Sequence, residues 1–282
     1  LPMFHVGGLC IKTLPAMPQS YLELEQELHS DNPSIKHVGE ILERDMAMSA
    51  KVLHLVNSAF FGLRERVAHP AQAASLLGIN TIKSLVLAFH VFGAWKDRHV
   101  PGFHPEILWT HSLDVALMAR EIAGVEGLSS SVKEESYIAG MFHDIGKLIL
   151  ADNLPESCEA IDRIMKESGL SLLQAETEVL GATHAETGAY LLALWGFTDS
   201  VVSACAFHHA PRQIPTRGLS TALIVHVANA FDHSNRAFGG VEPKDRVDVE
   251  WLEKEGLKAR YDVWRQTAMD FSPGGGSSTP DK

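Results

Sequence analysis

Apolar residues recur along this chain every three or four positions, with polar residues between them. That spacing places apolar side chains on one face of a helix, and no run alternates convincingly in the way that a strand does. In the first hundred residues the periodic segments are separated by turn and capping residues. Helices are expected to open after Pro18, Ser34 and Pro70, and Asn80 or Thr81 is expected to cap the next one. The pattern predicts an all-α protein.

The segment 98–105, RHVPGFHP, carries two Pro and one Gly and interrupts the helical periodicity. Such a segment is typical of a boundary, so we predict two helical lobes, residues 1–100 and 101–271. The last residues, 272–282, are rich in Gly and Ser and are expected to form a flexible polar tail.

Helix starts in the second lobe are marked by two S/T-x-x-E capping boxes, Ser131 with Glu134 and Thr183 with Glu186. The first box opens a helix that we expect to continue through residues 143 and 144. The second box places His184 in the first turn of its helix. Gly188, one turn further on, removes a side chain from the same face and would let another helix approach closely.

The composition is that of an ordinary globular protein, with 45% apolar and 21% charged residues. A net charge of −11 counts against nucleic acid and anionic membrane surfaces as partners, because both require basic patches. A helix-turn-helix DNA-binding regulator is therefore only a third hypothesis for the short N-terminal helices. The three cysteines are scattered and no signal peptide is visible, so we expect a cytoplasmic protein with reduced thiols.

The clearest chemical feature is the stretch YIAGMFHDIGKLIL, in which His143 and Asp144 are adjacent and Gly146 and Lys147 follow closely. Neutral imidazole and carboxylate groups suit Zn, Fe or Mn, and such sites are commonly assembled from several facing helices. No pair of cysteines has the spacing of a zinc ligand pair. The pair therefore predicts part of a metal site.

Other imidazoles occur on neighbouring predicted helices. His111 lies on the apolar side of its helix, where a lone histidine is usually a core residue, and His208 and His209 form a tandem pair. His226 and Asn229 are three residues apart and share one helical face, whereas Asp232 lies too far round the helix to replace Asn229 simply.

Three separated segments, LPAMP (14–18), ILERDMAMSAKVLHLVNSAFFG (41–62) and QAASLLGINTIKSLVL (72–87), occur in an order that resembles the HDOD family. Members of this family are bacterial signalling modules related to HD-domain phosphohydrolases. The resemblance continues into the second lobe and covers most of the chain. It implies a two-lobed helical fold whose C-terminal half is HD-like.

The order of the histidines also resembles that of HD-domain metalloenzymes, in which a first His, an HD pair and a distant Asp bind one metal. Two-metal relatives of the HD-GYP type add one His and a tandem pair. The ligand set that the resemblance implies is His111, His143, Asp144, His184, His208, His209 and Asn229. This chain departs from the pattern at Asn229, which stands in place of an Asp, and in HHAPRQIP, which lacks the Gly-Tyr-Pro continuation.

The implied cofactor is one or two divalent transition-metal ions, with Fe expected first and Mn or Zn as alternatives. A bound metal polarises a phosphoryl oxygen and lowers the pKa of bound water towards roughly 7. Asp144 and Lys147 are the candidate catalytic residues, with Lys147 facing a phosphate as a point charge. The alternative for Lys147 is a solvated lysine that complements a helix dipole.

These observations predict an HDOD signalling module that retains a metal site and acts through signalling proteins or a phosphorylated small molecule. The alternative is a metal-dependent phosphohydrolase acting on a nucleotide or another phosphoester. Metal content and activity separate the two hypotheses, because both share one fold.

Overall fold

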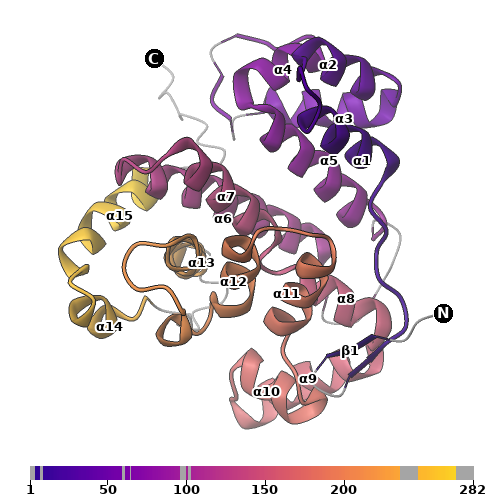
Figure 1. Ribbon diagram of the computed structural model, residues 1–282. Helices are drawn as coiled ribbons and strands as arrows, with labels where there is room; N and C mark the ends of the chain where they lie inside the picture. Colours follow the sequence, from indigo (N-terminus) through magenta and orange to yellow (C-terminus); the bar gives the residue numbers. More distant parts are fainter. Residues whose placement is uncertain are drawn as a thin grey trace, which may run out of the picture. The chain divides into compact units, whose positions relative to one another are not determined.

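The computed structural model describes residues 4–6, 9–58, 61–63, 65–95, 100, 103–235 and 247–270. The chain divides into two compact units (Figure 1). The N-terminal unit spans Ala16–Ala94, and the C-terminal unit spans Trp95–Asp270 together with the first fifteen residues. Helices dominate both units, which confirms the predicted all-α class.

The division differs from the predicted lobes at the N-terminus, because the segment before Ala16 belongs to the second unit rather than the first. Two three-residue strands, β1 (Phe4–Val6) and β2 (Leu9–Ile11), pair antiparallel there. The backbone amides of Lys12 and Thr13 then both donate to Asn153 Oδ1 at 2.8 Å. These hydrogen bonds fix the segment to the C-terminal unit. The predicted tail, 272–282, lies outside the described residues.

Helices of the N-terminal unit bury one apolar face each, as the periodicity predicted. They are α1 (Gln19–Leu28), α2 (Ile35–Glu43), α3 (Met46–Val56), α4 (Pro70–Leu77) and α5 (Ile79–Gly93). Ser34 caps α2 by accepting from the His37 amide, as expected. The predicted cap of α5 at Asn80 or Thr81 is wrong: Gly78, with a φ of 86°, joins α4 to α5.

Within the described ranges, no single helix is long and apolar enough to cross a membrane. Only α4 and α5 taken together reach that length and hydropathy, and they are bent by 119° at Gly78.

The C-terminal unit is built around two long helices that pack along each other, α6 (Pro105–Val125) and α7 (Ser130–Phe142), with α13 (Thr221–Asn235) against both. A Cβ atom on Gly140 would lie 2.6 Å from the Ala116 Cα, so glycine permits this close packing of α6 and α7. The remaining elements are α8 (Ile145–Asn153), α9 (Pro155–Ser168), α10 (Leu172–Leu180), α11 (His184–Leu194), α12 (Asp199–Phe207), a 3₁₀ turn (Pro211–Gln213), α14 (Val249–Lys254) and α15 (Lys258–Asp270).

Two local predictions for this unit are wrong and one is confirmed. Ser129, not Ser131, caps α7 by accepting from the Val132 amide, because the helix begins earlier than the S-x-x-E pattern suggested. The helix also does not continue through the HD pair, since α7 ends at Phe142 and α8 begins at Ile145. The Thr183–Glu186 capping box is present as predicted.

Candidate metal centre

Six of the predicted ligands converge in the C-terminal unit and form two overlapping groups. The first half-site consists of His111, His143 and Asp144, and the second consists of Asp144, His184, His208 and His209. Within each half-site the potential ligand atoms all lie within 4.8 Å of one another.

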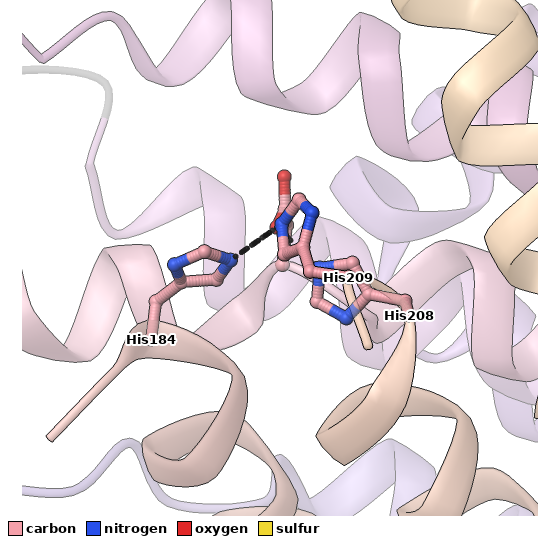
Figure 2. A group of neighbouring side chains, drawn as sticks. His184, His208 and His209 are labelled. Atoms are coloured by element: carbon pink, nitrogen blue, oxygen red, sulfur yellow. Dashed lines mark hydrogen bonds and ion pairs between the residues drawn. The ribbon is translucent and has the colours of Figure 1, made fainter. Parts of the chain in front are cut away.

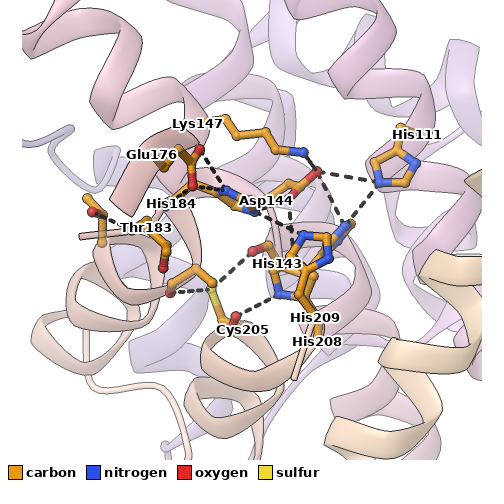
Figure 3. A network of polar contacts seen from close by, with 12 residues as sticks. His111, His143, Asp144, Lys147, Glu176, Thr183, His184, Cys205, His208 and His209 are labelled. Atoms are coloured by element: carbon orange, nitrogen blue, oxygen red, sulfur yellow. Dashed lines mark hydrogen bonds and ion pairs between the residues drawn. The ribbon is translucent and has the colours of Figure 1, made fainter. Parts of the chain in front are cut away.

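Asp144 belongs to both half-sites, and its two oxygen atoms face different histidines. Its Oδ2 lies 3.5 Å from Nε2 of His111 and 3.5 Å from Nε2 of His143. Its Oδ1 lies 3.2 Å from Nε2 of His184 and 3.5 Å from Nε2 of His208. This carboxylate is therefore placed to bridge two ions (Figure 3).

The break between α7 and α8 and the start of α11 bring the site together. His184 is the first residue of α11, and its ring is directed towards His208 and His209 at the end of α12 (Figure 2). A Cβ atom on Gly146 would lie 1.9 Å from the His184 carbonyl oxygen, and one on Gly188 would lie 3.0 Å from the Gly146 amide nitrogen. The two glycines let α8 and α11 pack closely, which confirms the role expected for Gly188.

Backbone carbonyls orient two of the imidazoles. His143 Nδ1 donates to the Gly140 carbonyl at 2.8 Å, and His208 Nδ1 donates to the Cys205 carbonyl at 2.7 Å. A carbonyl oxygen can only accept, so Nδ1 carries the proton in both rings. The Nε2 lone pair of each ring is then available to a metal.

Carboxylates orient two further imidazoles; sequence analysis missed Glu176, and it considered Asp232 only as a replacement for Asn229. His111 Nδ1 lies 2.6 Å from Asp232 Oδ2, and His184 Nδ1 lies 2.8 Å from Glu176 Oε2. Both carboxylates are buried, with 3% of each residue exposed. Asp232 is three residues from Asn229 on α13, and this spacing was a usable clue; Glu176, on α10, carried none.

The distances between Nε2 atoms fit shared metal ligation. His111 Nε2 lies 3.1 Å from His143 Nε2, and His184 Nε2 lies 3.2 Å from His209 Nε2. At these distances the two nitrogen atoms of each pair can share a proton in a hydrogen bond or, in its place, a bound cation. Metal–nitrogen bonds of about 2.0–2.1 Å at ordinary angles place two nitrogens roughly 3 Å apart. The residues present therefore fit a divalent metal.

Electrostatics favour the protonation states that metal ligands need. Burial lowers the pKa of His143 and of His208 well below the ordinary value, which keeps both rings neutral at pH 7. Burial acts to raise the pKa of Asp144, but the Lys147 charge and the hydrogen bonds with His111 and His184 outweigh it and hold that pKa well below its usual range. Asp144 is therefore an anion.

The carboxylate-bonded histidines behave differently. Burial acts to lower the pKa of His111, but hydrogen bonds with Asp144 and Asp232 outweigh it, and the pKa is raised. Burial also acts to lower the pKa of His184, and the Glu176 charge reverses the effect. The negative charge beside each ring favours positive charge at that position, carried either by a protonated imidazole or by a bound metal ion.

Lys147 contacts the site directly, through Nζ at 2.6 Å from Asp144 Oδ2. Its side chain is 20% exposed, so it is not the fully solvated helix-end lysine of the alternative interpretation. Its predicted contact with a phosphate stays a prediction. In this structure it neutralises the bridging carboxylate on the side of the first half-site.

The two polar residues predicted on α13 are both buried. His226 Nδ1 donates to the His208 carbonyl at 2.7 Å, so this ring supports the backbone of a ligand residue. Asn229 lies on the same helix as Asp232, and its role as a ligand stays a prediction.

A cavity of about 280 Å³ is lined by Lys147 and Glu176, which contact the proposed ligands Asp144 and His184. Asp162 and the apolar side chains of Leu150, Ile161 and Met165 complete this part of its wall. The volume is slightly below the roughly 300–1,000 Å³ typical of small-molecule sites. The cavity can therefore hold one small ligand or part of a larger one.

Comparison with known proteins places this arrangement in a family. The HDOD domain model matches residues 14–211. An uncharacterized protein of Treponema pallidum is 24% identical over 71% of this chain, and the chain spans 38% of that relative's length.

Two solved structures are similar over nearly the whole chain. An HDOD domain protein of unknown function from Geobacter sulfurreducens shares 23% identity, with a TM-score of 0.73 and coverage of 93% of this chain and 86% of its own. A protein from Shewanella amazonensis described as a candidate phosphohydrolase shares 26% identity, with a TM-score of 0.66 and coverage of 91% and 93%. Because the family model spans more than half of the sequence, this chain belongs to the HDOD domain family.

Proposed function

We propose that this HDOD chain is a signal-transduction module whose C-terminal unit binds one or two divalent transition-metal ions. The observation that carries the proposal is the convergence of oriented Nε2 atoms on both oxygens of Asp144. Fe is the metal proposed first, with Mn and Zn as alternatives, because the donors are imidazole and carboxylate groups without paired cysteines.

A regulatory role is favoured over catalysis by the charge of the ligand set. Asn229 is neutral where the resemblance expects an Asp, which leaves Asp144 as the single carboxylate among the proposed ligands. Two cations held close together repel, so occupancy of the second position then depends on conditions. We propose that the metal state, or a phosphorylated ligand held by it, is communicated to partner signalling proteins.

The second candidate is a metal-dependent phosphohydrolase. It is favoured by the cavity beside Lys147, and the Shewanella amazonensis protein described as a candidate phosphohydrolase is consistent with it. A bound metal would supply an activated water and a polarised phosphoryl oxygen. The chain itself would contribute Asp144 to hold the ions and Lys147, released from Asp144, to contact a phosphoryl oxygen.

Elemental analysis of protein purified without chelator, followed by reconstitution with Fe²⁺ under anaerobic conditions, tests the metal site. We expect at least one ion per chain. Metal content far below one ion per chain after reconstitution would overturn the proposal. Assaying the same samples with nucleotides, cyclic dinucleotides and p-nitrophenyl phosphate separates the candidates, since robust turnover would establish the phosphohydrolase.

A further inference from the structure

The proposed ligands carry little negative charge for the cations that they would hold. Five imidazoles and Asp144 supply a charge of −1, against +4 for two divalent ions, and an amide at position 229 adds nothing. The site is also buried, with His143, Asp144, His184 and His208 each at most 1% exposed. An uncompensated charge in such an environment is costly.

Two further carboxylates lie one hydrogen bond behind the ligands, and each serves a different half-site. Asp232 Oδ2 is 2.6 Å from His111 Nδ1 in the first half-site. Glu176 is 2.8 and 2.9 Å from His184 Nδ1 in the second, and its Oε2 also accepts from the His184 amide at 2.9 Å. His143 and His208 instead bond to backbone carbonyls, which orient a ring without bringing a net charge.

We propose that Asp232 and Glu176 are positioning residues that supply, through His111 and His184, the negative charge missing from the direct ligands. The inference rests on the proposed metal site. A carboxylate that accepts from Nδ1–H fixes the tautomer and strengthens Nε2 as a metal donor. The three carboxylates carry a charge of −3, or −2 with the Lys147 ammonium beside Asp144 included, which offsets more of the charge of two divalent ions than Asp144 alone does.

The geometry makes Asp232 the compensation for Asn229. Positions 229 and 232 are three residues apart on α13, and Asp232 is not in either ligand group but reaches Nδ1 of His111. The residue at 229 matches the ligand position of the resembling enzymes but is neutral here. The carboxylate one turn later acts on the same half-site through the imidazole of His111 rather than by direct contact.

Amide and alanine variants distinguish the charge of the two carboxylates from their effect on the orientation of the histidine rings. Asp232→Asn and Glu176→Gln keep a hydrogen-bond acceptor and lose the charge, whereas Asp232→Ala and Glu176→Ala lose both. Glu253→Gln is the matched control, because Glu253 pairs with Lys258 on the surface at 3.0 Å and the change in net charge is identical.

Two measurements are needed, of which only one involves metal. Chelator competition gives the Zn²⁺ affinity of each variant, and ¹⁵N NMR of the metal-free protein identifies which nitrogen of each imidazole is protonated. We expect Zn²⁺ binding to weaken about 10- to 100-fold in the Asn and Gln variants, as for other outer-shell partners of ligand histidines. The Glu253→Gln control should match the unmodified protein. Nδ1 protonation of His111 and His184 should persist in the Asn and Gln variants and be lost in the folded Ala variants.

Zn²⁺ affinities of Asp232→Asn and Glu176→Gln equal to that of the unmodified protein would overturn the charge role. A neutral imidazole protonated on Nε2 and not on Nδ1, in the unmodified metal-free protein, would overturn the positioning role. If the unmodified protein binds no Zn²⁺, the proposed metal function fails, and the NMR result still decides orientation by itself. Should Glu176→Ala not fold, Glu176→Gln and both Asp232 variants still decide the inference.

Discussion

The two half-sites share Asp144, but they differ in the number of donor atoms and in whether Lys147 competes with a metal ion for the Asp144 oxygen. The first offers three described donors, and its carboxylate oxygen Oδ2 is already held by Lys147 at 2.6 Å. The second offers four donors, and its Oδ1 faces His184 at 3.2 Å, away from the lysine contact. Four N/O donors complete a tetrahedral set, whereas three leave the shell open. We therefore expect the half-site containing the first His and the HD pair to bind a metal ion more weakly than the other.

This difference predicts an order of filling. An ion entering the second half-site meets three imidazoles, two of them oriented by hydrogen bonds at Nδ1, and a carboxylate oxygen. An ion entering the first half-site must displace the Lys147 ammonium and lacks the carboxylate that Asn229 replaces. We expect the second half-site to fill first, and the variants below break or reverse that order.

Asp144→Ala should have the largest effect, because it removes the ligand common to both half-sites. We expect metal to fall to background in both, a loss of affinity of about 100-fold or more. Elemental analysis after dialysis against a fixed free-metal concentration measures it. His226→Ala is the control, since His226 bonds to a backbone carbonyl and is not a proposed ligand. Equal metal loss in both variants would show that the ligand set is wrong.

His209→Ala and His111→Ala should affect different binding steps. Titration with Co²⁺, followed by its visible absorption, separates the first equivalent from the second. His209→Ala should weaken the first equivalent about 10- to 100-fold, and His111→Ala should leave it unchanged while abolishing the second. The reverse assignment would mean that the HD half-site fills first.

Much of this arrangement could be predicted from local sequence. Helical periodicity gave the all-α class, and the T-x-x-E box placed His184 at the start of a helix. The motif order brought together six proposed ligands that the structure also places close together.

What sequence analysis missed depends on tertiary contacts. The pairing of Glu176 with His184 joins α10 to α11, and that of Asp232 with His111 joins residues 121 positions apart. The break at the HD pair was missed because the apolar periodicity runs through it, although the backbone does not. Periodicity reports which face of a helix is buried and carries no information on such partners.

Asn229→Asp should reduce the difference in metal affinity between the two half-sites. A carboxylate at 229 would add a negative charge beside the first half-site, and we expect the second ion to bind about tenfold more tightly, equivalent to about 1.4 kcal/mol. Cyclic-dinucleotide hydrolysis is expected to be weak or absent in the unmodified protein, because the metal clamp on attacking and leaving oxygens is incomplete. Turnover by Asn229→Asp alone would identify the missing carboxylate as the cause. Robust turnover by the unmodified protein would refute the signalling-module proposal.

Lys147→Met should have the smallest effect. It removes the ammonium that competes with a metal ion for Asp144 Oδ2. Removing the ammonium frees Asp144 Oδ2, so the second ion should bind more tightly, whereas loss of a ligand would weaken it. The Lys147 side chain is 20% exposed, so solvent screens part of its attraction to the buried Asp144, and we expect a gain of about fivefold, equivalent to about 1 kcal/mol. Lys258→Met is the control, because Lys258 pairs with Glu253 on the surface and neither is a proposed ligand. The second Co²⁺ equivalent measures the gain, and weaker binding in Lys147→Met would mean that the lysine supports the site rather than competing with the metal.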